Sequence, residues 1–279
     1  MRRSRPFTIG AYVLLILIFL FLIFPFLWVI DSSVRFEQNL FSGKFLENVG
    51  GLTLQHYKSV LSAGASGQFR VYFTNSLIIA VSSTVVVMLL SLVGAYALSR
   101  FKLRGKNGIL LTILSSNMFP HVLLSVGIFG ILFDFHLVDS YIGIILTHII
   151  LGLPFGLWLV KGYFDALPID LDEAARLDGV GSLGILFKIL VPIAAPGMVV
   201  AGFYAFMVSW GDFLFVSIIS QSLETQTLTI GLNKFFGSTQ VQWGPINAAT
   251  VVTIAPTIVI FGLLQKYIVS GLASGAVKG

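Results

Sequence analysis

Long runs of apolar residues recur along the chain and are separated by shorter polar segments. A helix needs about 20 mostly apolar residues to cross a membrane, because the hydrocarbon core is ~30 Å thick and each helical residue rises ~1.5 Å. Six windows meet this requirement, at about 7 to 30, 73 to 98, 109 to 133, 141 to 162, 197 to 219 and 246 to 268. The pattern therefore predicts an all-α membrane protein with six transmembrane helices.

Composition supports this class. Of the 279 residues, 56% are hydrophobic and only 10% are charged, against roughly 25% charged in an ordinary soluble domain. The basic start followed by an apolar run imitates a secretory signal peptide, but the run from Phe7 to Ile30 is too long and no Ala-x-Ala site follows, so we expect an uncleaved first span. The absence of cysteine excludes disulfides, thiolate zinc sites and cysteine nucleophiles.

The net charge of +5 is carried by short basic clusters beside the apolar runs, not along one polar face. We interpret these clusters as topology signals and expect no nucleic-acid partner. One set of flanks holds twelve of the 17 Lys and Arg residues, namely Arg2, Arg3, Arg5, Arg100, Lys102, Arg104, Lys106, Lys161, Arg176, Lys188, Lys266 and Lys278. Positive charge gathers on the cytoplasmic side, so both termini are predicted to be cytoplasmic.

Two connections are long. The outer one, about 31 to 72, holds an amphipathic segment at 52–61 that predicts a short helix. In the inner one, from about 163 to 196, Asp170 can cap a helix, Glu173 can complete a capping-box-like pair, and Gly179 can close the far end in the left-handed conformation. Such a two-turn helix is unstable alone and needs packing at both faces. The adjacent Ala174 and Ala175 let another surface approach closely.

The second part of the inner connection carries an apolar group before Pro192 and Pro196. It predicts a second short helix whose apolar face packs against the spans. The group comprises Ile185, Leu186, Phe187, Ile189 and Leu190. A small-residue helix braced by an apolar one would transmit force between a partner and the membrane. The residues alone leave a solvated loop with turn residues at its ends equally open.

Polar groups inside the predicted spans are costly, at least ~2.5 to 3.5 kcal/mol for a mid-helix Asp. Asp212 is therefore expected to face a cavity or a partner, with a position at the outer interface or a helix end as the alternative. His121 and His148 favour hydrogen bonds within the bundle over metal ligation, because no ligand cluster has convergent spacing, and no metal site is predicted. Prolines, including Pro120 in the third span, permit kinks.

Three aromatic residues, Trp210, Tyr204 and Trp243, have faces suited to the apolar side of a sugar ring, although Trp and Tyr also gather at membrane interfaces. We favour the interface for Trp243 and leave the other two open. The candidate residues of a translocation pathway are Asn117, His121, Tyr204, Trp210 and Asp212.

The stretch EAARLDG at 173–179, with Pro192 and Pro196 downstream, resembles the "EAA" loop of permease subunits of ABC importers. More of the chain is similar to the carbohydrate branch, in particular to MalG-like subunits. The matching segments are FPFLWVI at 24–30, NSLI at 75–78, AYALSRF at 95–101, SWGDFL at 209–214 and SGLASGAVKG at 270–279. Gly211 departs from relatives that often have Asn there.

The resemblance implies a type I ABC importer permease fold. It implies a first helix with an outer loop at 1–72 and a five-helix transmembrane domain at 73–279 that includes the coupling loop 163–196. The implied coupling helix docks on an ATPase subunit through Asp170, Glu173, Ala174, Ala175, Arg176, Asp178 and Gly179. A second contact is implied for the tail, at Gly271, Ser274, Gly275, Lys278 and Gly279.

The resemblance also implies a multi-pass protein of the bacterial inner membrane that moves a sugar or related solute. Its partners would be a second homologous permease, two ATP-binding subunits and an extracytoplasmic solute-binding protein. No phosphate-binding Gly-rich loop with its Lys is present, so ATP and Mg are expected on the partner ATPases and no cofactor on this chain.

The alternative is an ion-gradient-driven secondary carrier or channel. It would need ionisable groups within the membrane, and Asp212 is the only acid plausibly inside a predicted span. The absence of an evident internal repeat weakens it further. An enzyme is the least supported class, because no nucleophile, metal cluster or carboxylate pair converges at one membrane depth.

Overall fold

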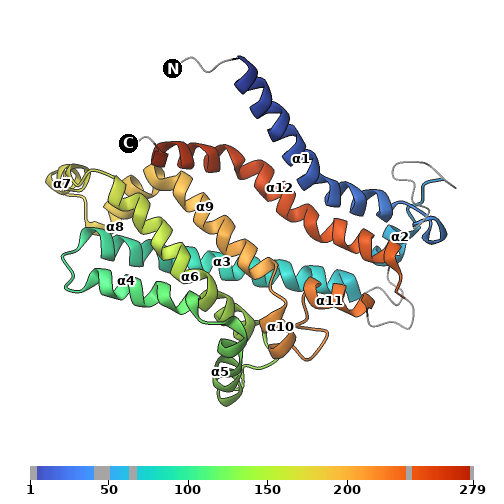
Figure 1. The fold of residues 1–279 in the computed structure, drawn as a ribbon. Helices are drawn as coiled ribbons and strands as arrows, with labels where there is room; N and C mark the ends of the chain where they lie inside the picture. The colour runs from blue at the N-terminus through green and yellow to red at the C-terminus, as the bar shows by residue number, and fades with distance from the viewer. Residues whose placement is uncertain (1–4, 41–50, 63–67, 237–240, 277–279) are drawn as a thin grey trace. The chain divides into compact units, whose positions relative to one another are not determined.

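The computed structural model describes residues 5–40, 51–62, 68–236 and 241–276, with side chains from 7 to 267 within those ranges. These residues form helices and no strand, apart from one isolated bridge between Arg35 and Leu52. The α-helices are α1 (Arg5–Ser33), α2 (Gln55–Leu61), α3 (Gln68–Arg100), α4 (Lys106–Ser115), α5 (His121–Asp134), α6 (Tyr141–Ala166), α7 (Asp170–Leu177), α8 (Ser182–Gly184), α9 (Val191–Trp210), α10 (Leu214–Ile219), α11 (Leu228–Phe236) and α12 (Trp243–Ala276) (Figure 1). The all-α prediction is confirmed.

Five helices in the described ranges are long and apolar enough to cross a membrane, and a sixth span is formed if one bent pair counts as one. That pair is Lys106–Met118 with His121–Asp134, and its halves meet at 102°. The predicted third span at 109–133 is therefore broken. The cause is Pro120, which disfavours helical geometry in the residue before it: Phe119 is extended, with φ −71° and ψ 138°.

The predicted fifth span at 197–219 is also corrected. The helix runs from Ser182 to Trp210. Residues 211–213 are not helical, and α10 begins after them. The apolar group expected to form a separate short helix is instead the first part of this long helix, as a π-helical turn at Ile185–Leu190. Pro192 crowds the carbonyl four residues earlier, and that carbonyl lies inside the wider π turn.

The chain divides into two compact units: unit 1 is Met1–Phe69 with Leu232–Ala255, and unit 2 is Arg70–Gly231 with Pro256–Gly279. The first junction falls near the expected boundary at 72 and 73. The sequence did not indicate that the stretch 232–255 groups with the first unit. The division of function between 1–72 and 73–279 stays a prediction.

In unit 2, α6 and α9 lie side by side (Figure 1). The close approach depends on Gly197: a Cβ there would lie 2.0 Å from the ring of Tyr163. An apolar cluster at the α7 end of the unit joins α3, α6, α7, the π turn and α9. Its fully buried members are Ala95, Val160, Phe164, Ile185, Leu186, Leu190 and Ala201. A second cluster packs α10 against α5 and α6 through Leu132, Ile144 and Phe215.

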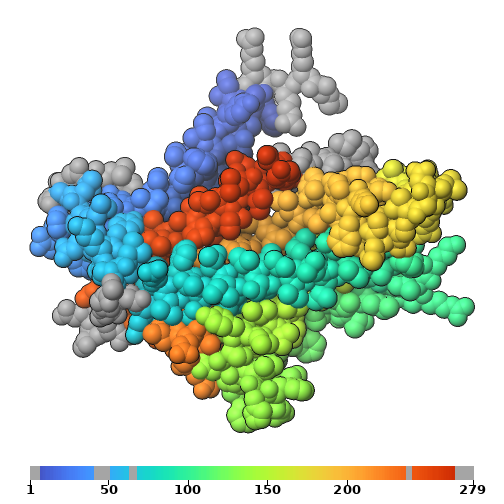
Figure 2. Space-filling model, turned by 180° about the vertical axis from the view of Figure 1, so that it is seen from behind, coloured from blue at the N-terminus to red at the C-terminus, as the bar shows by residue number. Residues whose placement is uncertain are grey.

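The space-filling view shows α3, in cyan to teal, open along one face (Figure 2). α3 carries apolar residues that are about half exposed, among them Val85, Leu89 and Val93, which are spaced four residues apart and so share one side of the helix. Such a face fits lipid or another apolar helix. In unit 1 the apolar stretch of α1 that could cross a membrane is 0% buried. Its exposed apolar side chains also fit lipid or another apolar helix.

Unit 1 is organised by polar contacts around the end of α1. The side chain of Arg35 pairs with Asp31 at 2.8 Å, and its carbonyl oxygen lies 2.7 Å from Nε2 of His56. The carboxylate of Glu37 accepts the backbone N–H groups of Trp243 and Gly244, at 2.8 and 2.9 Å, at the start of α12. The short helix expected at 52–61 is present as α2.

Candidate functional site

The helix α7 stands at one end of unit 2, between α6 and α8 (Figure 1). Three acids in its first turn and Arg176 in its last turn complement the helix dipole. The predicted cap is wrong: the N-cap is Ile169, no side chain caps the helix, and Asp170 is the first helical residue. The acids therefore act through charge and not through a capping hydrogen bond.

The far end of α7 closes as the sequence predicts. Gly179 has φ +77°. Its N–H donates to the carbonyl of Arg176 at 3.0 Å, and the N–H of Val180 donates to the carbonyl of Ala175 at 2.9 Å. This pair of hydrogen bonds is the Schellman motif. Gly179 therefore ends α7 sharply and turns the chain back toward the apolar cluster, where Val180 packs.

α7 has two faces. Asp172 and Ala175, three residues apart on one side of the helix, are buried, at 2% and 5% exposure. The opposite side carries Asp170, Glu173, Ala174 and Leu177, which are exposed. Arg176, Asp178 and Gly179 are exposed as well, in the last turn and just beyond it. Ala175 thus faces its own bundle, and it is the buried member of the seven predicted docking residues.

Leu177 is the residue of this surface that the sequence prediction missed. Its side chain is 89% exposed, on a helix otherwise rich in charge. It follows Glu173 and Ala174 by four and three residues, the spacing of neighbours on one helix face. That spacing was the available signal. An apolar side chain held in this position is suited to entering a pocket of another subunit.

The buried side of α7 holds an ion pair. Nε of Arg100, at the end of α3, lies 3.0 Å from Oδ2 of Asp172, and the two side chains are 6% and 3% exposed. Nη2 of Arg100 donates to the carbonyl of Leu167 at 3.3 Å. Next to it, Oγ of Ser99 donates to Oδ1 of Asp165 at 2.6 Å. The end of α3 is therefore joined to both α6 and α7. Arg100, interpreted from the sequence only as a signal of membrane orientation, also forms this structural contact.

Asp212 does not lie within a helix that crosses the membrane. It follows α9 and precedes α10, and its Oδ2 accepts the N–H of Val216 at 3.1 Å. The same oxygen lies 3.2 Å from Nε2 of His148, whose Nδ1 is 2.6 Å from Oγ of Ser209. The expected mid-span position is wrong, and the helix-end alternative holds. The expectation that His148 is hydrogen-bonded within the bundle is confirmed.

The other pathway candidates are dispersed. Asn117 is half-buried in the turn η2 (Ser116–Met118), and His121 begins α5 with its ring 5.9 Å from that of Phe215. Tyr204 packs on Phe155, with ring centroids 4.3 Å apart.

Trp210 is buried, stacked on Phe206 at 5.3 Å and edge-on to Phe73 at 5.8 Å. It is thus a core residue here. Its ring is covered by two neighbours, so it offers no open face for stacking on a sugar.

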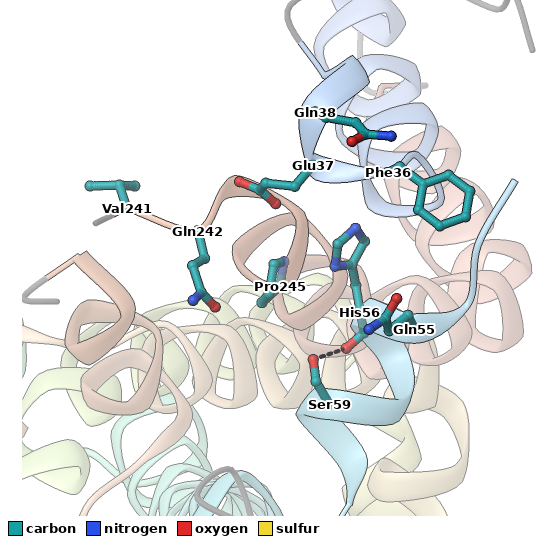
Figure 3. A pocket seen from close by; sticks show the side chains of 9 residues that line it. All are labelled: Phe36, Glu37, Gln38, Gln55, His56, Ser59, Val241, Gln242 and Pro245. Atoms are coloured by element: carbon teal, nitrogen blue, oxygen red, sulfur yellow. Dashed lines mark hydrogen bonds between the residues drawn. The ribbon is translucent and has the colours of Figure 1, made fainter. Parts of the chain in front are cut away.

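Unit 1 contains a cavity of about 690 Å³ lined by none of these candidates. Figure 3 shows its lining, with Glu37 and Gln38 on one side, Gln55, His56 and Ser59 on α2, and Gln242 and Pro245 opposite. Oγ of Ser59 donates to the carbonyl of His56 at 2.8 Å. Glu37 and His56 are already hydrogen-bonded to the backbone, so they shape the cavity.

The predicted tail contact falls partly outside the described residues, which end at 276. Lys278 and Gly279 lie outside them. Gly271, Ser274 and Gly275 belong to α12, whose backbone continues as a helix to Ala276. Within the described ranges no group of three or more His, Cys, Asp or Glu side chains is placed to hold a metal ion.

Five or six apolar spans, with a short, tightly closed helix that exposes a mixed face at one end, define a multi-span membrane protein. The family described as "Binding-protein-dependent transport system inner membrane component" matches residues 72–274. The chain belongs to this family and is a permease component of ABC importers, whose ATPase activity resides in separate subunits.

Relatives and a solved structure agree. The chain is 36% identical to the inner membrane ABC transporter permease protein YcjP of Escherichia coli K12, over 97% of this chain and 96% of that one. It is 32% identical to the trehalose/maltose transport system permease protein MalG of Thermococcus litoralis, over 95% and 94%. A bacterial ABC transporter involved in alginate import shares the fold, with a TM-score of 0.79 and 24% identity over 96% and 98%.

Proposed function

We propose that this chain forms half of the pathway of an ABC importer that carries a sugar or related solute into the cytoplasm by alternating access. The observation that carries the proposal is α7: a helix of 8 residues, closed by a Schellman motif, with its buried side fixed to the bundle and its other side exposed. A relative named for trehalose and maltose supports a sugar substrate.

The assembly would contain a second homologous permease, two ATP-binding subunits and an extracytoplasmic solute-binding protein. The unburied window of α1 supports the permease partner, because it leaves an apolar helix face for lipid or another chain. The sequence has no phosphate-binding loop, so ATP and Mg would bind the ATP-binding subunits and this chain would not be the enzyme. The Lys and Arg distribution supports cytoplasmic termini.

The proposed docking surface is Glu173, Ala174 and Leu177, with Asp170, Arg176, Asp178 and Gly179 at its margin. All of these residues are exposed on α7 or at its end. The part of the tail on α12, at Gly271, Ser274 and Gly275, is proposed as a second contact. For the pathway, we propose that Asn117 and His121, at the break of the bent pair, approach the solute. Tyr204, Trp210 and Asp212 would position the helices around it.

The test replaces Leu177 with arginine in an affinity-tagged chain expressed in its own host. The expected result is normal membrane insertion with loss of the co-purifying ATP-binding subunits, because a charge replaces the apolar group that enters the partner. Leu103→Arg is the matched control: this leucine is 44% exposed and follows α3 at the same end of unit 2.

Retention of the ATP-binding subunits by Leu177→Arg would contradict the docking assignment. The carrier alternative is tested separately, with the purified chain alone in proteoliposomes and radiolabelled maltose or trehalose as the solute. Uptake driven by a proton or sodium gradient, without ATP-binding subunits, would favour the carrier.

A further inference from the structure

The ion pair between Arg100 and Asp172 joins elements far apart in the sequence. Arg100 is the last residue of α3 and Asp172 lies in the first turn of α7. Because Arg100 also donates to the carbonyl of Leu167, one side chain holds the end of α3, the start of α7 and the connection from α6. No other ion pair in the described ranges involves α7.

The pair is buried but its geometry is not optimal. The charges are 3.0 Å apart, yet Nε of Arg100 and both carboxylate oxygens of Asp172 lack an aligned hydrogen bond within the described ranges. Buried charges are expensive unless they are paired and hydrogen-bonded. The attraction between the charges opposes their separation, and no aligned hydrogen bond within the described ranges fixes the angle between the two side chains.

The remaining attachment of α7 is of a different kind. Ala175 presents a single methyl group to the apolar cluster, and Val180 follows beyond Gly179. Apolar contacts of this size are non-directional, so they permit sliding. Among the described residues, the ion pair is the charged contact between α7 and α3.

α3 extends from the Arg100–Asp172 ion pair to the opposite end of unit 2. It contains 33 residues with no proline, which corresponds to about 50 Å of continuous helix. Near its other end, Nδ2 of Asn75 donates to the carbonyls of Leu223 and Gln226, at 3.2 and 2.8 Å. Oγ of Ser76 accepts the N–H of Leu228 at 2.9 Å. One helix therefore connects α7 with the segment between α10 and α11.

We propose that the Arg100–Asp172 ion pair is the link through which movement of α7 reaches α3, and through α3 the segment 220–228 at the far end of the unit. This inference rests on the proposed function, in which ATP-binding subunits move α7. It assigns a positioning role to two residues that touch neither the partner nor the solute.

The test uses the complete importer purified from its host. Because the chain has no cysteine, single cysteines at Thr74 on α3 and Ile142 on α6, both exposed, can carry spin labels. In the wild type, MgATP with vanadate is expected to change the distance between the labels. In Asp172→Asn the ATP-binding subunits should stay bound and basal ATP hydrolysis should persist, but the distance change should be lost.

Transport by Asp172→Asn should fall by at least about five-fold relative to ATP hydrolysis, at the lower end of coupling energies between sites. The reversed pair, Arg100→Asp with Asp172→Arg, should restore much of the distance change. Such a rescue is not expected if the two residues are needed only for packing. Asp134→Asn, the same change at an exposed acid at the end of α5 and outside the proposed docking surface, is the matched control and should behave as wild type.

A distance change in Asp172→Asn equal to that of the wild type would overturn the inference. Loss of the ATP-binding subunits from Asp172→Asn, or loss of inserted protein in both it and the reversed pair, would also overturn it, because the pair would then serve only docking or folding. Failure of the proposed function would instead appear as ATP-binding subunits that remain bound to Leu177→Arg.

Discussion

Replacing Gly179 with alanine should loosen the end of α7 without creating a clash. Its φ of +77° lies in the left-handed region, where a residue with a Cβ costs roughly 1 to 2 kcal/mol. No atom lies within 4 Å of the position that a Cβ would take, so backbone strain is the whole effect. A change of that size alters the opening equilibrium of the last turn about 5- to 30-fold.

Hydrogen exchange of the purified full chain measures this directly. The backbone N–H groups of residues 179 and 180, which close the Schellman motif, should exchange faster in Gly179→Ala by about that factor. Gly179→Asn should show a smaller increase, because asparagine tolerates the left-handed conformation. The matched control is Gly181→Ala, where φ is −70° and there is also open space.

Equal acceleration in Gly181→Ala, or no acceleration in Gly179→Ala, would refute the assignment of the effect to the left-handed conformation. In the assembled importer the same strain should weaken the hold on α7. Transport by Gly179→Ala should therefore fall while the amount of inserted protein changes little.

Gly197→Ala places a methyl group 2.0 Å from the Tyr163 ring and should cost about 1 to 3 kcal/mol of stability. The thermal unfolding temperature should therefore fall. Gly162→Ala is the control and should leave that temperature unchanged, because the space around Gly162 is open. For Asp139, burial acts to raise the pKa, but hydrogen bonds from Thr225, Ser222 and Gln221 lower it from 3.8 to about 2. Its stabilising contribution is therefore complete above pH 3.8 and lost toward pH 2. Exchange at 220–225 should differ between wild type and Asp139→Asn at pH 6 and converge near pH 2; a constant difference would contradict this.

The sequence predicted the elements whose signals are local. Apolar runs located the spans because length and composition alone decide whether a helix can cross a membrane. Gly179 was predictable because a glycine at the end of a short helical pattern is the typical residue for a left-handed cap. The role of Asp170 was not predictable in the same way, because an acid accepts a capping hydrogen bond only where the helix begins just after it. The helix begins one residue earlier than predicted, so Ile169 is the N-cap.

Contacts that depend on packing were beyond a single sequence. Arg100 and Asp172 are charged residues in charge-rich segments, and nothing near either of them signals a buried pair. Their burial follows from the meeting of α3 and α7, which is set by the apolar cluster. The exposure of Leu177 could not be predicted either, because an apolar residue on a short helix is ordinarily assigned to the core.

Three of the polar residues expected inside spans lie next to helix breaks. Asn117 lies in the turn between the halves of the bent pair, His121 begins the second half, and Asp212 follows the end of α9. At each position the helix is interrupted, so backbone N–H or carbonyl groups are available to polar partners. The backbone N–H of Val216, which Asp212 accepts, is one such group. Breaks of this kind are tolerated at membrane depth only where protein or water covers them. The two breaks therefore mark where this permease departs from simple spanning helices, and they leave backbone groups there available to polar partners.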